Sequence, residues 1–155
     1  MRIEVPFLGK TKSGYIKNGI DDFSSRLTRY VSLDIKQIRV KPAKGLSLKQ
    51  QIGEEAKLLD ASLSPGSYRI ALDRTGRSIS SEALSELVCS LENQGIKRVS
   101  FLIGGPLGLA ENLLKGADLV LSLSQMTFTH DLARLLLLEQ LYRAYTIKAG
   151  ENYHK

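Results

Sequence analysis

The chain has 155 residues, a net charge of +6 and 43% apolar residues, which are values of an ordinary globular domain. It contains no run of about 18 apolar residues and no apolar N-terminal signal segment, so we expect one cytoplasmic domain, residues 1–155, with no membrane span. Its one cysteine, Cys89, excludes an internal disulfide, and no Cys, His and Asp cluster has metal-ligand spacing, so no metal is expected.

Hydrophobic patterning predicts strands and helices that alternate along the chain. Strands are predicted at 2–8, 33–40, 68–72, 98–103 and 119–123, and helices at 14–30, 47–61, 81–94 and 131–149. Such alternation is typical of an α/β fold, a mostly parallel sheet with helices on both faces, and this is the fold class we expect. Pro6 inside the first strand predicts an edge strand or a bulge, because proline has no N–H for the sheet.

Local signals indicate where several of these elements begin and end. Ser47 and Gln50 have the spacing of a capping box, Ser80 can cap the third helix, and Gly95 can end it. The buried face of the helix at 14–30 is predicted from its apolar stripe: Tyr15, Ile16, Ile20, Phe23, Leu27 and Tyr30.

The positive charge is concentrated in the first third of the chain. Residues 1–50 hold 11 Lys and Arg against 4 Asp and Glu, whereas residues 51–155 hold 11 against 12. A localised basic patch favours a polyanionic partner, usually a nucleic acid, and the alternative is a solvated basic face without a partner. Within this third, the loop Lys41-Pro42-Ala43-Lys44-Gly45 is the leading candidate for contacts with phosphate.

Three predicted strands end at Leu72, Ile103 and Leu123, and the ends of parallel strands meet at one edge of the sheet, where loops build ligand sites. One such loop, 104–108, reads Gly-Gly-Pro-Leu-Gly, and its glycines let the backbone approach a ligand closely. The motifs GxGxxG and GxxxxGK[ST] are absent, which excludes the usual dinucleotide and P-loop sites. A plain strand-to-helix turn without a ligand is the alternative.

The last predicted helix is apolar around most of its circumference. Its large apolar side chains are Leu132, Leu135, Leu136, Leu137, Leu138, Leu141, Tyr142 and Tyr145. Because the sheet can cover only one side, we expect a second subunit on the other side, and therefore a homodimer. His130 follows Thr129, a candidate cap, at the start of this helix, and His154 lies in the tail. The helix spans about 28 Å and the tail reaches about 17 Å, so a site that uses both ends needs two chains.

Four motifs, in this order, resemble the RlmH family of SPOUT methyltransferases over the whole chain. They are LIGGPLGL at 102–109, LSLSQMTFTH at 121–130, EQLYRAY at 139–145 and YHK at 153–155. The resemblance implies a SPOUT fold with a C-terminal trefoil knot. It also implies methylation, by S-adenosylmethionine, of N3 of a pseudouridine in the 23S rRNA of the assembled ribosome. The residues implied to bind this cofactor are Leu72, Gly104, Leu123, Ser124, Gln125, Met126, Thr127 and Phe128.

The implied reaction needs a proton acceptor, because N3 of the base must lose its proton to become a good nucleophile. An imidazole accepts a proton near neutral pH, so His154 and His130 are the candidates. Backbone donors or Arg143 are the candidates for stabilising the negative charge that develops on the base. The residues expected to contact RNA are Lys41, Lys44, Arg134 and Tyr153.

Three other functions stay open on the residues alone. A non-catalytic RNA-binding module would use the basic first third and leave the loop at 104–108 unexplained. An α/β nucleotide-binding protein of flavodoxin type would need phosphate-binding loops, of which the chain has few. Another SPOUT enzyme would methylate a ribose 2′-hydroxyl or a tRNA guanine, and only the YHK tail and the short chain speak against it.

Overall fold

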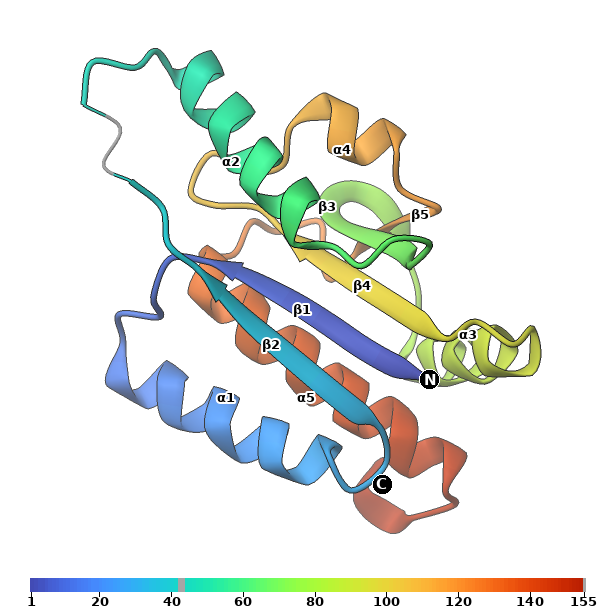
Figure 1. Cartoon of the computed structure of the whole chain (residues 1–155). Helices are drawn as coiled ribbons and strands as arrows, with labels where there is room; N and C mark the ends of the chain where they lie inside the picture. The colour runs from blue at the N-terminus through green and yellow to red at the C-terminus, as the bar shows by residue number, and fades with distance from the viewer. Residues whose placement is uncertain (42–43, 155) are drawn as a thin grey trace.

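The computed structural model describes residues 1–41 and 44–154, and only the backbone of His154. Its strands form one parallel sheet in the order β2-β1-β4-β3-β5 (Figure 1). The strands are β1 (Arg2–Leu8), β2 (Ser32–Ile38), β3 (Tyr68–Ser78), β4 (Arg98–Ile103) and β5 (Leu119–Ser122). The helices are α1 (Gly14–Leu27), α2 (Leu48–Ser62), α3 (Ser81–Asn93), α4 (Glu111–Lys115), α5 (His130–Lys148) and the short 3-10 helix η1 (Asn152–His154).

Helices cover both faces of the sheet, so the predicted fold class is confirmed (Figure 1). On one face, α1, α3 and α5 enclose the larger core, which contains Ile3 of β1, Phe101 of β4 and Leu138 of α5. The smaller core, under α2 and α4 on the other face, consists of Leu8, Ala56, Leu59 and Leu113. Since both faces are buried, the strands are apolar along most of their length, as parallel strands usually are.

The position of β1 corrects the prediction drawn from Pro6. β1 lies between β2 and β4, so it is not an edge strand, and its pairing with β2 runs without a bulge from Arg2 to Leu8. β1 pairs with β4 only from Arg2 to Glu4. Beyond Glu4 the strand has one paired neighbour, so the missing N–H of Pro6 interrupts no bond to β4.

The predicted caps are confirmed. Ser47 Oγ accepts from Gln50 N at 3.3 Å, and Gln50 Oε1 accepts from Ser47 N at 2.8 Å, which completes the capping box of α2. Ser80 Oγ accepts from Ala83 N at 3.2 Å at the start of α3. Gly95 follows α3 with a φ of +76°, the left-handed conformation that ends many helices.

α1 ends at Leu27, three residues before its predicted end. The N–H groups of residues 29 and 30 donate to carbonyls three residues back, so the chain tightens into a turn there. Most of the predicted apolar stripe packs in the core, but Tyr15 is 80% exposed and is corrected to a surface residue. Tyr15 lies in the first turn, ahead of Ile16, the first buried residue of the helix.

α5 is flanked by helices of its own chain. α1 and α3 pack along it (Figure 1). Leu137 and Leu138 are fully buried in the core that α5 shares with these helices and the sheet. Leu135 packs onto Gly19 of α1, where a Cβ would lie 2.9 Å from Leu135 Cδ1. The apolar circumference of α5 therefore does not by itself require a second subunit, although Leu136 stays half-buried.

β3 is longer than the predicted 68–72 and continues to Ser78. Leu72 and Arg77 both pair with Leu121 of β5, so residues 73–76 leave the ladder as a bulge between them. Bulges redirect side chains at the rim of a sheet, and this one lies at the carboxyl edge, where Leu72 ends the regular part of the strand.

Candidate functional site

Three neighbouring strands end around a cavity at the carboxyl edge of the sheet. Leu72 of β3, Ile103 of β4 and Leu123 after β5 lie in its wall, and its volume is about 360 Å³. Other residues expected at the cofactor also line it: Gly104, Ser124, Met126, Thr127 and Phe128. Gln125 does not line this cavity and is exposed. The structure thus brings together all of the expected cofactor residues except Gln125.

The loop after β4 is folded so tightly that Gly104 has no room for a side chain. A Cβ there would lie 2.4 Å from the carbonyl carbon of Gly108 and 2.7 Å from Leu109 N. Gly108 N donates to Gly105 O at 3.0 Å, which closes a turn with Pro106 at its second position. At Gly104 the wall is therefore bare backbone, which a ligand can approach closely.

The β3 bulge forms the opposite rim of the cavity. Gly76 brings the chain back to β5, and a Cβ there would lie 2.7 Å from the carbonyl carbon of Val120. Asp73 Oδ1 accepts from Thr75 N at 2.9 Å and from Thr75 Oγ1 at 2.6 Å. These hydrogen bonds, led by the one from the Thr75 side chain, lower the pKa of Asp73, so its carboxylate stays charged. Asp73 and Arg74 both line the cavity.

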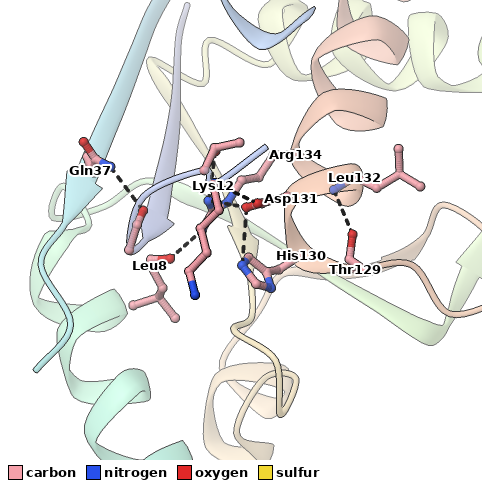
Figure 2. A network of polar contacts seen from close by, with 10 residues as sticks. Leu8, Lys12, Gln37, Thr129, His130, Asp131, Leu132 and Arg134 are labelled. Atoms are coloured by element: carbon pink, nitrogen blue, oxygen red, sulfur yellow. Dashed lines mark hydrogen bonds and ion pairs between the residues drawn. The ribbon is translucent and has the colours of Figure 1, made fainter. Parts of the chain in front are cut away.

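Serine side chains shape the loop between β5 and α5. Ser122 Oγ donates to Ser124 O at 2.9 Å, and Ser124 Oγ accepts from Met126 N at 3.0 Å. These bonds fold the loop locally, as serine often does in turns, and leave Met126 75% exposed at the cavity. Thr129 Oγ1 accepts from Leu132 N at 3.3 Å, which confirms Thr129 as the cap of α5 (Figure 2).

His130, the first residue of α5, lines the cavity and contacts a buried polar network (Figure 2). Its Nε2 lies 3.3 Å from Asp131 Oδ1. The same oxygen accepts from Arg134 Nη1 at 2.9 Å, and Asp131 Oδ2 accepts from Lys12 N at 3.1 Å. Asp131 therefore joins the start of α5 to the loop after β1, with His130 at the cavity side of the junction.

The surroundings of His130 favour its neutral form. Burial lowers the pKa of His130 most, the positive charges of Arg134 and Lys12 lower it further, and Asp131 opposes them. The carboxylate of Asp131, 3.3 Å from Nε2, is close enough to stabilise the imidazolium when the ring takes up a proton.

Arg134 lies in the interior, and this corrects its expected role as an RNA contact. Its side chain is 1% exposed, and it donates to Thr11 Oγ1 at 3.1 Å and to the carbonyl of Leu8. The guanidinium also lies 4.6 Å from the centre of the Phe7 ring. A buried guanidinium with these partners cannot grip a phosphate, so Arg134 instead fastens the end of β1 to α5.

Arg143 and Tyr153 lie at the other end of α5. Arg143 donates to Glu139 Oε1 from Nε at 3.0 Å and from Nη2 at 2.7 Å, and its guanidinium lies 4.8 Å from the centre of the Tyr153 ring. Tyr153 also donates to Glu139 at 3.3 Å. Thirteen residues of helix place Arg143 about 20 Å from His130 along the axis. Within one chain, these residues therefore do not meet the cavity.

Two parts of the expected site lie outside the described residues: Pro42 and Ala43 of the basic loop, and Lys155 of the tail. The side chain of His154 is likewise not described. Lys41 and Lys44 line a second cavity of about 690 Å³, between the end of β2 and α2.

Sequence reasoning missed Asp73, Arg74 and Asp131. The Asp-x-Thr spacing of residues 73–75 is a turn signal that indicates the bulge, whereas nothing in the sequence ties Asp131 to the distant Lys12. Within 1–41 and 44–154, no three His, Cys, Asp or Glu residues are grouped as metal ligands would be. No helix in the same ranges has the length and apolarity needed to span a bilayer.

Comparisons with known proteins agree with this geometry. Residues 1–154 match the family model described as "Predicted SPOUT methyltransferase". The chain is 48% identical over 155 residues to the "Ribosomal RNA large subunit methyltransferase H" of Desulfotalea psychrophila, and 42% identical over 159 residues to that of Clostridioides difficile. Both alignments cover 100% of each chain. The structure of a probable methylase family protein from Haemophilus influenzae is similar with a TM-score of 0.53 at 12% identity, covering 99% of this chain and 70% of that one, which supports the fold alone.

Proposed function

The chain belongs to the SPOUT methyltransferase family, within its large subunit rRNA methyltransferase H (RlmH) group, and on this basis we propose that it methylates N3 of a pseudouridine in 23S rRNA. The methyl donor in this proposal is S-adenosylmethionine, and the substrate is the assembled ribosome in the cytoplasm. One observation carries the proposal: the cavity at the carboxyl edge collects Leu72, Gly104 and the loop after β5 in one wall.

The residues of this cavity fit S-adenosylmethionine. Leu72, Leu123 and Met126 offer apolar surface for a flat adenine, and the bare backbone at Gly104 can approach the ribose or the methionine part. The cofactor carries positive charge, and Asp73 supplies a carboxylate in the cavity lining. When bound, S-adenosylmethionine supplies a methyl group activated by its sulfonium.

His130 is the group of the described chain best placed to take the proton from N3. Asp131 Oδ1 lies 3.3 Å from its Nε2, and the lowered pKa favours the neutral ring, which can accept a proton. Methyl transfer would break the bond between the sulfonium sulfur and the methyl carbon as the bond from N3 to that carbon forms, S-adenosylhomocysteine would leave, and His130 would take the N3 proton. Asp131 is a positioning residue that orients this ring and stabilises the imidazolium that results.

Arg143, Tyr153 and His154 would reach a cavity only from a second chain. Their distance along α5 from the cavity of their own chain supports a homodimer in which the tail of one protomer completes the site of its partner. The half-buried Leu132 and Leu136 of α5 are suited to this contact. In that arrangement Arg143 stabilises the negative charge on the base and His154 is a second candidate proton acceptor. The trefoil knot implied by the family is part of the same proposal.

Labelled methyl transfer tests this function. Purified protein and labelled S-adenosylmethionine are incubated with ribosomes from a strain that lacks the protein, with naked 23S rRNA, and with tRNA. The proposal predicts label in the large-subunit rRNA of intact ribosomes. Label in tRNA alone would move the activity to another SPOUT substrate, and RNA binding without any label would favour a non-catalytic module.

A further inference from the structure

Unpaired basic side chains gather just beyond β2. Arg39, Lys41 and Lys44 are exposed, and within residues 1–41 and 44–154 none of them has a hydrogen bond or an ion pair. Because all strands run in the same direction, this group lies on the same carboxyl edge as the candidate cofactor cavity.

The three basic residues border the second cavity, which we call the β2–α2 groove. It has a volume of about 690 Å³, and Val40, Leu46 and Leu58 give it an apolar lining. Two carboxylates also face it, but Glu54 is paired with Lys57 at 2.7 Å. Glu55 is the second carboxylate, and burial raises its pKa. With Lys57, four basic side chains line the groove against two acidic ones. The groove therefore keeps an excess of positive charge.

The surface around the groove is uncovered. Residues 44–50 are all exposed, including Leu48 at 64% and Leu46 at 40%. Figure 1 shows the N-terminal end of α2 and residues 44–47 before it standing clear of the other helices and the sheet. Apolar and basic side chains in such a position suit a ligand with flat rings and negative charges, which describes a nucleic acid strand.

The groove and the cofactor cavity share a wall. Glu55 lines the groove, and a Cβ on Gly105 would lie 2.5 Å from Glu55 Oε2. Gly105 itself lines the cofactor cavity. A strand lying in the groove would thus lie next to the cofactor cavity, across this contact between α2 and the loop after β4.

We infer that the β2–α2 groove binds the phosphodiester backbone of the rRNA strand that carries the target nucleotide. Arg39, Lys41 and Lys44 contact consecutive phosphates, and the apolar lining receives a neighbouring unstacked base. The inference rests on the proposed function, and adds to it the path by which the substrate enters the cofactor cavity past Gly105.

A charge-removal variant tests the groove, with a matched control. The groove variant is Arg39→Gln/Lys41→Gln/Lys44→Gln. The control, Arg29→Gln/Lys17→Gln/Lys97→Gln, removes the same residue types from α1, from the turn that follows it and from the opposite edge of the sheet. Binding to ribosomes from a strain lacking the protein is measured between 50 and 200 mM salt. The salt slope is the steepness with which log affinity falls against log salt concentration, and the loss of three phosphate contacts lowers it by about 2. Over this range the affinity of the wild type should therefore fall about 20-fold more than that of the groove variant.

The control variant should keep the slope of the wild type, and all three proteins should bind S-adenosylmethionine equally. An unchanged salt slope in the groove variant, or the same reduction in both variants, would refute RNA binding in the β2–α2 groove. If the groove variant loses cofactor affinity, Lys41→Gln and Lys44→Gln are measured singly, and each should lower the slope by about 0.7. Methyl transfer by the wild type in the same preparations tests the proposed function separately.

Crosslinking distinguishes RNA from ribosomal protein as the occupant. A photoreactive amino acid placed at Lys44 should attach to 23S rRNA near the methylated nucleotide. Attachment to a ribosomal protein and not to rRNA would overturn the inference while leaving the methylation reaction in place.

Discussion

Gly104→Ala tests whether the loop after β4 forms the cofactor cavity. The new Cβ would lie 2.4 Å from the carbonyl carbon of Gly108, against an ordinary contact of at least 3.4 Å, so the loop must move by about 1 Å. Overpacking of this kind costs about 1–3 kcal/mol, which corresponds to a fall in Tm of about 2–12 °C for a chain of this size. The same displacement at the ligand should weaken S-adenosylmethionine binding about 10- to 100-fold.

Titration calorimetry and thermal denaturation measure the two effects on the same samples. The matched control is Gly14→Ala at the start of α1, where a Cβ meets nothing within 4 Å and both measurements should stay at wild-type values. Gly108→Ala separates backbone strain from crowding, because Gly108 has a φ of +81° but open space around it. Wild-type cofactor affinity in Gly104→Ala would refute the assignment of this cavity.

Three further changes test the polar groups. Asp131→Asn should lower kcat about tenfold. It should also shift the acid limb of the pH–rate profile to lower pH, because Asp131 raises the pKa of His130. An unshifted acid limb would exclude the His130–Asp131 pair from the proton transfer. Arg134→Met should destabilise the fold by about 3–5 kcal/mol in denaturant titration, because Asp131 is left without its buried partner; a change under about 1 kcal/mol would contradict this role. Burial raises the pKa of Glu4, but hydrogen bonds from two serine hydroxyls hold it below its usual value. Glu4 therefore stabilises the fold at a pH above its pKa in the unfolded chain. This contribution is lost as the pH falls through its lower pKa in the folded chain. Glu4→Gln should flatten the pH dependence of Tm below about pH 4.5, and an unaltered slope would refute that assignment.

The order of elements and the edge that carries the site could be predicted from sequence because they depend on local patterns. Apolar runs located the strands, and Ser47, Ser80 and Thr129 located three helix starts. Parallel strands then bring Leu72 and Leu123 to one edge whatever the details of packing.

The rest depends on contacts between residues far apart in the chain. The β3 bulge depends on the close approach of Gly76 to the backbone of Val120, and no pattern within residues 68–78 predicts this contact. An arginine on a helix is usually a surface residue, and the sequence predicts this for Arg134. It is buried instead, because its guanidinium donates to the carbonyl of Leu8 and packs on the ring of Phe7. Similarly, the sequence does not show that α1 and α3 pack along α5 and cover much of its apolar circumference.

Identification of the methylated nucleoside tests the central claim most directly. Ribosomes labelled by the purified protein are digested to nucleosides, and the labelled product is identified by mass spectrometry against the unlabelled ribosomes. We expect N3-methylpseudouridine from large-subunit rRNA, at one site per ribosome, with the yield lost in His130→Gln. A methyl group on a ribose 2′-oxygen or on a guanine would contradict the proposed chemistry at N3.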